Sequence, residues 1–208
     1  MLYSSLKNIC DCLIFIPNLQ LIKPIIILNN SHMKKILIVF ILSPLCFVTA
    51  QNFRGLDKSP MDRTSYPAPY RISDKAVVVT YSRPQLKGRS FDEIVPENKI
   101  WRTGANEATE IRVFKPILFG GKSLDVGTYS LYTIFGENNV TVIVNTAINS
   151  WGSYSYKQEN DIARVVIPQT KSDTSLEAFS MAFSENETAA TLDIGWGYMR
   201  ASVPVSVL

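Results

Sequence analysis

The amino-acid sequence predicts an all-β domain, an antiparallel β-sandwich of about eight or nine strands with at most one short helix. Three observations lead to this prediction. Short segments of alternating or continuous apolar residues recur after residue 73, turn residues separate them, and a single brief stretch carries a helix-start pattern. Short strands at this spacing are typical of a sandwich or a barrel, and we expect the sandwich.

The apolar pattern predicts eight strand segments, at residues 76–81, 109–113, 128–135, 140–145, 162–167, 178–183, 190–196 and 201–205. The clearest alternation places Ile111 and Val113 on one face and Glu110 and Arg112 on the other. This is the pattern of a strand with one buried face, because successive side chains of a strand point to opposite sides.

Turns and one helix start are predicted between these strands. Gly136–Asn139 is a plausible hairpin turn, and Glu185–Thr188 is a second turn. The run Ser90-Phe-Asp-Glu93 has the spacing of a capping box, in which a serine and a glutamate satisfy each other's backbone groups. Pro96 limits the helix to about one turn.

The first fifty residues are predicted to be no part of the domain. Residues 33–50 have the layout of a secretory signal peptide: two lysines, an apolar run at 36–47, and small residues before Gln51. Residues 1–32 do not fit a presequence, and we expect them to be an upstream start-site artefact. The product is therefore expected to be exported, to the periplasm or the medium, without a stable membrane anchor after cleavage.

The rest of the chain divides into a lead-in and one domain. Residues 51–73 are polar and contain Pro60, Pro67 and Pro69, so we expect an extended lead-in. Residues 74–208 are expected to form the single sandwich domain. The 158 residues after residue 50 are enough to bury a core without disulfide bonds.

Composition excludes several kinds of function for residues 51–208. All three cysteines and the single histidine precede residue 51, so Ser-His-Asp or Cys-His catalysis and Cys/His zinc sites are excluded. Residues 51–208 contain 17 basic and 17 acidic residues. This neutral balance argues against nucleic acid as a partner.

The segment Trp101–Thr109 concentrates polar and aromatic residues that hydrophobic periodicity does not require. As a ligand site, it would use Trp101 as a stacking face and Arg102 as a charged donor. As a structural loop, it would pair Arg102 with Glu107 and place Gly104 at positive φ. Both interpretations stay open. The candidate ligand-binding residues are Trp101, Arg102, Thr103, Asn106 and Glu107, with Arg83, Tyr132 and Trp151 as second contributors.

Two further groups of residues could contribute to recognition. Arg83, Arg89 and Arg102 would form a small anion-binding mouth if their loops lie together, or else are solvated charges at strand ends. The aromatic residues of Trp151–Tyr156 have a spacing suited to stacking on a sugar, although packing at a strand edge is the alternative.

A catalytic function without histidine would need carboxylates. The candidates are Glu107, paired with Glu110 or Asp161, for a hydrolase that acts on glycans. Asp161 and Arg164 are more simply a structural ion pair. No cofactor is expected, although Asn106, Glu107 and Asp161 could supply oxygen ligands to calcium.

The chain resembles the DUF2911 family of exported bacterial proteins of unknown function. The resemblance covers about residues 57–205 and is carried by the following segments: Ser59-Pro60, Tyr81-Ser-Arg-Pro84, Lys87-Gly-Arg89, Val95-Pro96, Trp101–Thr109, Gly127-Thr-Tyr-Ser-Leu131 and Trp151-Gly152 with Asp161 and Arg164. Two departures are Phe91-Asp92, where Phe-Gly is expected, and the glycine-rich Gly195-Trp-Gly197. The resemblance implies an exported β-rich domain but no established activity.

These observations favour a binding module for a polar small molecule or a glycan at the Trp101–Thr109 loop. The alternatives are a carboxylate-dependent hydrolase and an envelope-associated structural or interaction module. The oligomeric state is not predicted.

Overall fold

The computed structural model describes residues 51–185 and 190–208. Within these ranges ten strands form two antiparallel sheets, as the sequence predicts. The described part of the chain from residue 54 onwards belongs to one compact unit. The predicted start-site artefact, the signal peptide and most of the turn at 185–188 lie outside the described residues.

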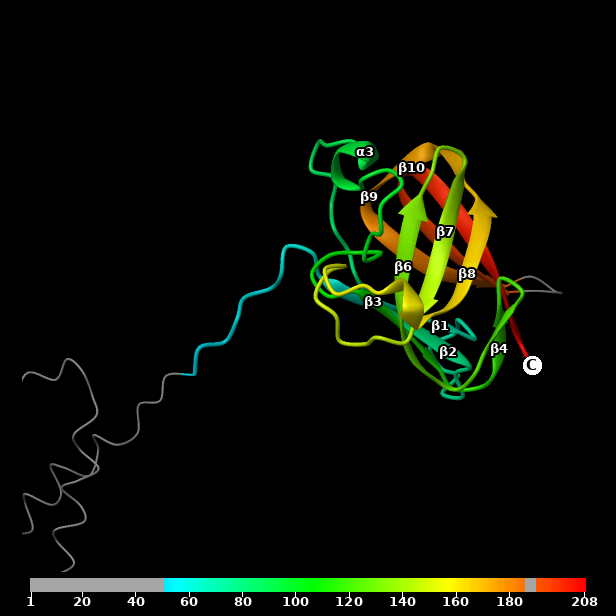
Figure 1. Cartoon of the computed structure of the whole chain (residues 1–208). Coiled ribbons are helices and arrows are strands. Elements are labelled where there is room, and N and C mark those ends of the chain that lie inside the picture. The colour runs from blue at the N-terminus through cyan, green and yellow to red at the C-terminus, as the bar shows by residue number, and fades with distance from the viewer. Residues whose placement is uncertain (1–50, 186–189) are drawn as a thin grey trace, which may run out of the picture. The chain divides into compact units, whose positions relative to one another are not determined.

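The two sheets lie face to face, with β6, β7 and β8 in front of β9 and β10 in Figure 1. The first sheet has six strands in the order β1 (Met61–Tyr66), β2 (Val77–Ser82), β3 (Thr109–Val113), β6 (Gly127–Phe135), β7 (Asn139–Asn145) and β8 (Asp161–Pro168). The second has four in the order β5 (Lys122–Leu124), β4 (Ile117–Phe119), β10 (Ala190–Val207) and β9 (Thr170–Glu185). The helix α3 (Phe91–Ile94) and the 3-10 turn η3 (Gln158–Asn160) complete the described elements.

The core lies between the two sheets. Alternate residues of each strand face inward, which is why the burial of β3 alternates along Thr109–Val113. The largest buried side chains include Phe119, Phe179 and Trp196 from the four-stranded sheet. Leu131 of β6 is fully buried in the same core. The inward residues therefore meet in one layer between the sheets.

One corner of the sandwich is closed by hydrogen bonds between the sheets. The hydroxyl of Tyr81 on β2 donates to the carbonyl oxygen of Met181 at 3.0 Å and accepts from the amide of Met181 at 2.9 Å. Three further bonds join the same two sides: Leu86 N to Glu177 O at 2.9 Å, Phe179 N to Pro84 O at 2.9 Å, and Phe183 N to Thr64 Oγ1 at 3.2 Å. The outer edge of β9 is thus hydrogen-bonded to β1, to β2 and to the segment that follows β2.

The predicted segments correspond to strands, but their number and lengths differ. β1 lies inside the predicted lead-in and pairs with β2, so the sheet begins before residue 74. It escapes prediction because it is a polar strand at the edge of the sheet. β4 and β5 have only three residues each, too few to show a period. The last two predicted segments are one continuous strand, β10, with irregular pairing near Gly197.

The predicted helix and hairpin are confirmed. Helix α3 spans Phe91–Ile94, and the amide of Ser90 donates to the carboxylate of Glu93, as in a capping box. The β6–β7 hairpin turns at the predicted residues, where Gly136 N donates to Asn139 O. Helix α3 lies at one end of the sandwich in Figure 1, where this hairpin also turns.

Candidate functional site

The Trp101–Thr109 loop folds back on itself and is held by backbone bonds. The amide of Thr109 donates to the carbonyl of Arg102 at 3.1 Å, and the Thr109 hydroxyl donates to the carbonyl of Thr103 at 2.6 Å. Gly104 lies against β2, because a Cβ atom there would be 2.9 Å from the Ser82 carbonyl oxygen. Thr103 is fully buried with a φ of 56°. Most of the loop therefore serves as a structural closure.

Trp101 is a core residue. Only 5% of it is exposed, and its ring contacts those of Phe135, Phe179 and Trp196 with centroids 5.2–5.9 Å apart. The interpretation of Trp101 as a ligand-stacking face is wrong, because the four rings fill the space between the sheets. Thr103 is likewise buried, with its hydroxyl 3.2 Å from that of Thr133, so it is also a structural residue.

The side chains of Arg102, Asn106 and Glu107 do not pair with one another in the described residues. Within the described part of the chain Arg102 makes no ion pair with Glu107, and its Nε is buried without a hydrogen-bond partner. The backbone carbonyl of Asn106, with φ of 60°, accepts from Gly152 N at 3.0 Å. Glu107 is exposed and forms an isolated bridge with Trp151. The expected internal Arg102–Glu107 pair does not form.

The carboxylate of Asp57, in the chain before β1, is exposed and accepts from the amide of Ser59 at 2.7 Å. This hydrogen bond is the first cause that lowers the pKa of Asp57, and the Asn106 side chain contributes in the same direction.

Two of the three arginines of the expected anion-binding mouth, Arg83 and Arg89, have structural partners. Arg83 pairs with Asp62 at 2.9 Å and donates to Phe179 O at 3.0 Å and Ser180 Oγ at 2.8 Å. These bonds connect β2 to both β1 and β9. Arg89 donates to the carbonyl of Leu86 within its own turn. Arg83 therefore has a structural role, and its role as a ligand contact stays a prediction.

The aromatic residues around Trp151 divide into exposed and buried ones. Trp151 is 61% exposed and Tyr154 is 87% exposed, on the loop before η3. Tyr132 is fully buried and packs edge-on against Tyr156 with ring centroids 5.1 Å apart. Trp151 stays a prediction as a ligand contact, whereas Tyr132 is wrong as one, because its ring is covered on the outer side of β6.

Two of the three candidate carboxylates have structural partners. Glu110 accepts from the amide of Asn149 at 3.0 Å. Asp161 is held on both oxygens, one by Asn145 Nδ2 and the other by Tyr156 and Arg164, each at 2.7 Å. The predicted Asp161–Arg164 ion pair is confirmed. In residues 51–185 and 190–208 no group of three or more acidic side chains is placed to hold a metal.

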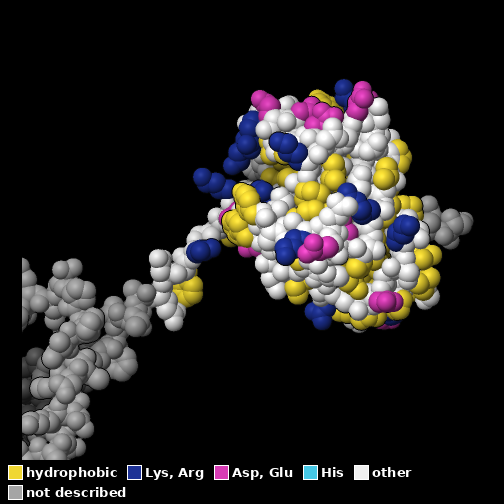
Figure 2. All heavy atoms as spheres, in the orientation of Figure 1, with side chains coloured by type: hydrophobic (Ala, Val, Ile, Leu, Met, Phe, Trp, Pro, Cys, Tyr) yellow, Lys and Arg dark blue, Asp and Glu magenta, His cyan; other side chains and the backbone are white. Residues whose placement is uncertain are grey.

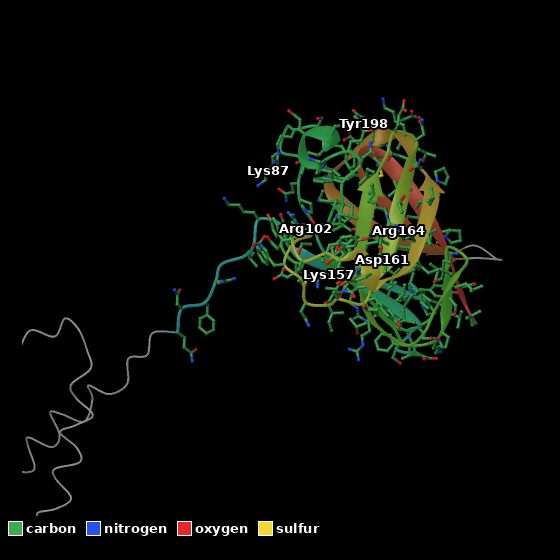
Figure 3. The ribbon with its side chains drawn as sticks, in the orientation of Figure 1. Lys87, Arg102, Lys157, Asp161, Arg164 and Tyr198 are labelled. Atoms are coloured by element: carbon green, nitrogen blue, oxygen red, sulfur yellow. The ribbon has the colours of Figure 1, made fainter. Side chains whose placement is uncertain are left out.

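The Asp161 cluster changes the acidity of a tyrosine. Burial raises the pKa of Tyr156 to about 12, and its hydrogen bond to the Asp161 carboxylate contributes in the same direction. Both effects favour the neutral phenol. The bonds of Asp161 connect the start of β8 to Asn145 and Tyr156, and Figure 3 shows Asp161 and Arg164 close together there.

A hollow in the described surface lies at the α3 end of the sandwich. This Tyr198 pocket has a volume of about 590 Å³ and is lined by residues from four parts of the chain, among them Arg89, Phe91, Gln169, Lys171, Glu177 and Tyr198. Figure 3 shows Tyr198 at this end of the domain and Arg102 well away from it. Both acidic and basic side chains gather at the same end in Figure 2.

The Tyr198 pocket combines an aromatic ring with polar groups. Tyr198 is 51% exposed, and the Lys171 ammonium lies 5.7 Å from the centre of its ring. The Oε1 atom of Gln169 is buried without a partner among the described residues. Glu177 accepts from the amide of Lys87 at 2.8 Å, which fixes one carboxylate oxygen at the pocket wall.

Of the residues that the sequence analysis considers for recognition, Arg89 lines this pocket, and the sequence gives little other sign of it. Both departures from the family pattern do contribute to its wall, through Phe91-Asp92 and Gly197. Gly197 has a φ of 53° at the irregular pairing of β10, and this distortion of the strand turns Tyr198 outward. A glycine within a strand pattern is the signal that could have indicated the bulge.

In the described ranges no helix is long and apolar enough to cross a membrane.

Comparison with known proteins gives the family. No curated protein and no solved structure matches the chain. The model of the family described as "Protein of unknown function (DUF2911)" matches residues 59–205, which is most of the chain, and the chain therefore belongs to the DUF2911 family.

Proposed function

We propose that this protein is an exported binding protein that takes a polar small molecule or glycan in the Tyr198 pocket. The observation that carries the proposal is the pocket itself. Its volume of about 590 Å³ lies in the range of small-molecule sites, and it unites an exposed aromatic ring with a few polar groups. A sugar has an apolar face and a polar rim, and a tyrosine beside charged and amide groups matches both.

Two polar features support recognition of hydroxyl groups. The Gln169 oxygen is buried without a partner in the described residues, and a buried acceptor of this kind costs about 1–3 kcal/mol unless it is bonded. A ligand hydroxyl would donate to it. Lys171 offers ammonium hydrogens beside the Tyr198 ring, so one ligand can contact both the ring and the charge.

The test compares two exposed tyrosines. Tyr198→Ala removes the aromatic wall, whereas Tyr154→Ala removes an even more exposed tyrosine that does not line the pocket. Calorimetry against a panel of mono- and oligosaccharides should give binding that Tyr198→Ala abolishes and Tyr154→Ala preserves. Both variants should unfold at nearly the wild-type temperature, because surface substitutions change stability by about 0.5 kcal/mol or less.

Other results would assign recognition to another surface of the protein. Binding that survives Tyr198→Ala and Gln169→Leu, but is lost in Trp151→Ala, would assign recognition to the Trp151–Tyr156 loop. Loss of a macromolecular partner in Trp151→Ala, with no binding of small molecules to the wild type, would favour an envelope-associated interaction module.

A further inference from the structure

A second pocket adjoins the Tyr198 pocket and shares part of its lining, including Phe91 and Asp92 of α3. This Glu97 pocket has a volume of about 440 Å³ and continues from the helix to the β6–β7 turn. Its lining consists of Phe91, Asp92, Val95, Glu97, Phe135, Gly136, Glu137 and Gln169. Four of these residues, Phe91, Asp92, Glu137 and Gln169, also line the Tyr198 pocket. The two hollows are therefore neighbouring parts of one groove that passes α3.

We infer that the ligand is a chain of at least two sugar units that occupies both pockets, with an amine-bearing unit in the Glu97 pocket. This inference rests on the proposed function, because it assumes that the Tyr198 pocket binds the first unit. Each pocket alone has the volume of a small-molecule site, so a single ring would leave half of the groove in water.

The wall that the pockets share is suited to the junction of such a chain. Phe91 packs edge-on against Phe135 and Trp196, with ring centroids 5.0 Å and 6.0 Å apart, so the core fixes its position. The buried Gln169 oxygen without a partner in the described residues lines both pockets. A rotation of the Gln169 side chain would bring this acceptor to a donor at the link between two units.

The charged residues that line the two pockets differ. The Tyr198 pocket is lined by charges of both signs, Arg89 and Lys171 together with Asp92, Glu137 and Glu177. The charged side chains that line the Glu97 pocket are all acidic: Asp92 and Glu137, which the two pockets share, and Glu97. None of these three carboxylates forms an ion pair among the described residues. A hollow lined by charge of one sign concentrates its field on the ligand, so the Glu97 pocket favours a positively charged group.

The experiment uses three probes and one pair of matched variants. The probes are glucosamine, its β-1,4-linked tetramer, and the neutral tetramer of glucose. Glu97→Gln neutralises a carboxylate that lines only the second pocket, and Glu159→Gln neutralises an exposed carboxylate that lines neither pocket. Calorimetry with the intact protein measures each dissociation constant at two salt concentrations, since a charge contribution weakens with salt.

The inference predicts an ordered set of affinities. The amine tetramer should bind about tenfold or more tightly than the monomer. The second unit adds contacts, whereas the translational and rotational freedom of the ligand is lost only once. The amine tetramer should also bind more tightly than the neutral tetramer. Glu97→Gln should remove that difference while the affinity for the neutral tetramer stays unchanged, and Glu159→Gln should behave as the wild type.

The contrary outcomes separate the two proposals. Equal affinity for monomer and tetramer, both lost in Tyr198→Ala, would overturn the two-pocket ligand and leave the proposed function in place. A preference for the amine tetramer that persists in Glu97→Gln would overturn the assignment of the amine to the Glu97 pocket. No binding of any probe to the wild type would overturn this inference alone, because the proposed function is tested on the wider panel of saccharides. Binding that survives in both Tyr198→Ala and Glu97→Gln would overturn both proposals.

Discussion

Trp101 and Trp196 stack across the sandwich, with ring centroids 5.9 Å apart and ring planes only 13° from parallel. Trp101 begins the polar loop beside the six-stranded sheet, and Trp196 belongs to β10 of the four-stranded sheet. The loop that seemed from its residue types to be a ligand site is thus attached to the centre of the core. Its specific residues serve the closure of the fold.

Trp101→Ala should therefore destabilise the protein by about 3–5 kcal/mol, the usual cost of removing a buried aromatic side chain. Trp151→Ala is the matched control, because Trp151 is 61% exposed and should change the free energy of unfolding by about 0.5 kcal/mol or less. Urea unfolding followed by circular dichroism measures both. Equal losses in the two variants would contradict the assignment of Trp101 to the core.

Gly104→Ala should also destabilise the protein, by about 1–3 kcal/mol. The new Cβ atom would be 2.9 Å from the backbone carbonyl of Ser82, which cannot move without disturbing β2. Gly55→Ala is the control, since a Cβ atom there meets nothing within 4 Å. A midpoint of unfolding that is unchanged for Gly104→Ala would show that the loop has room to shift.

Arg83→Met should lower the free energy of unfolding by about 1–3 kcal/mol without affecting ligand binding. The substitution keeps an apolar stem but removes the bonds to Asp62, Phe179 O and Ser180. Arg71→Met, at an exposed arginine, is expected to have a small effect. Weaker binding of the glycan probes in Arg83→Met at unchanged stability would instead make Arg83 part of the recognition surface.

Tyr156→Phe should make stability less sensitive to alkaline pH. Burial and the Asp161 carboxylate raise the pKa of Tyr156 from 10.0 to about 12, so the folded protein holds the phenolic proton more tightly than the unfolded chain. This contribution is complete below pH 10 and is lost as the pH rises through about 12. Denaturant titrations across this window should give a smaller decline for Tyr156→Phe than for the wild type, and parallel declines would refute the coupling.

The strands could be predicted where one face is buried and the segment is long enough to show it. Ile111 and Val113 in β3, and Phe179 and Met181 in β9, alternate with more exposed neighbours, and the structure buries them. The first part of β9 is exposed and polar, so only its buried half carried a pattern. β1 gave no signal for a similar reason, because an edge strand with polar side chains resembles a loop.

The site was harder to predict because it depends on which strand ends meet. Trp101 has the composition expected of either a stacking face or a core residue, and only the position of Trp196 decides between them. Phe91, Gln169 and Tyr198 come from three separate segments that the fold brings to one end. A single sequence does not contain that arrangement, although Gly197 marks the place where β10 departs from regular pairing.

The closed corner between β2 and β9 has a consequence for association with other molecules. An open outer strand offers its backbone groups to a strand of another chain, and this is a common route to aggregation. The amides of Phe179, Met181 and Phe183 are already bonded to Pro84, Tyr81 and Thr64. A second molecule would have to displace these partners one by one, so this part of the β9 edge resists pairing with a strand of another chain.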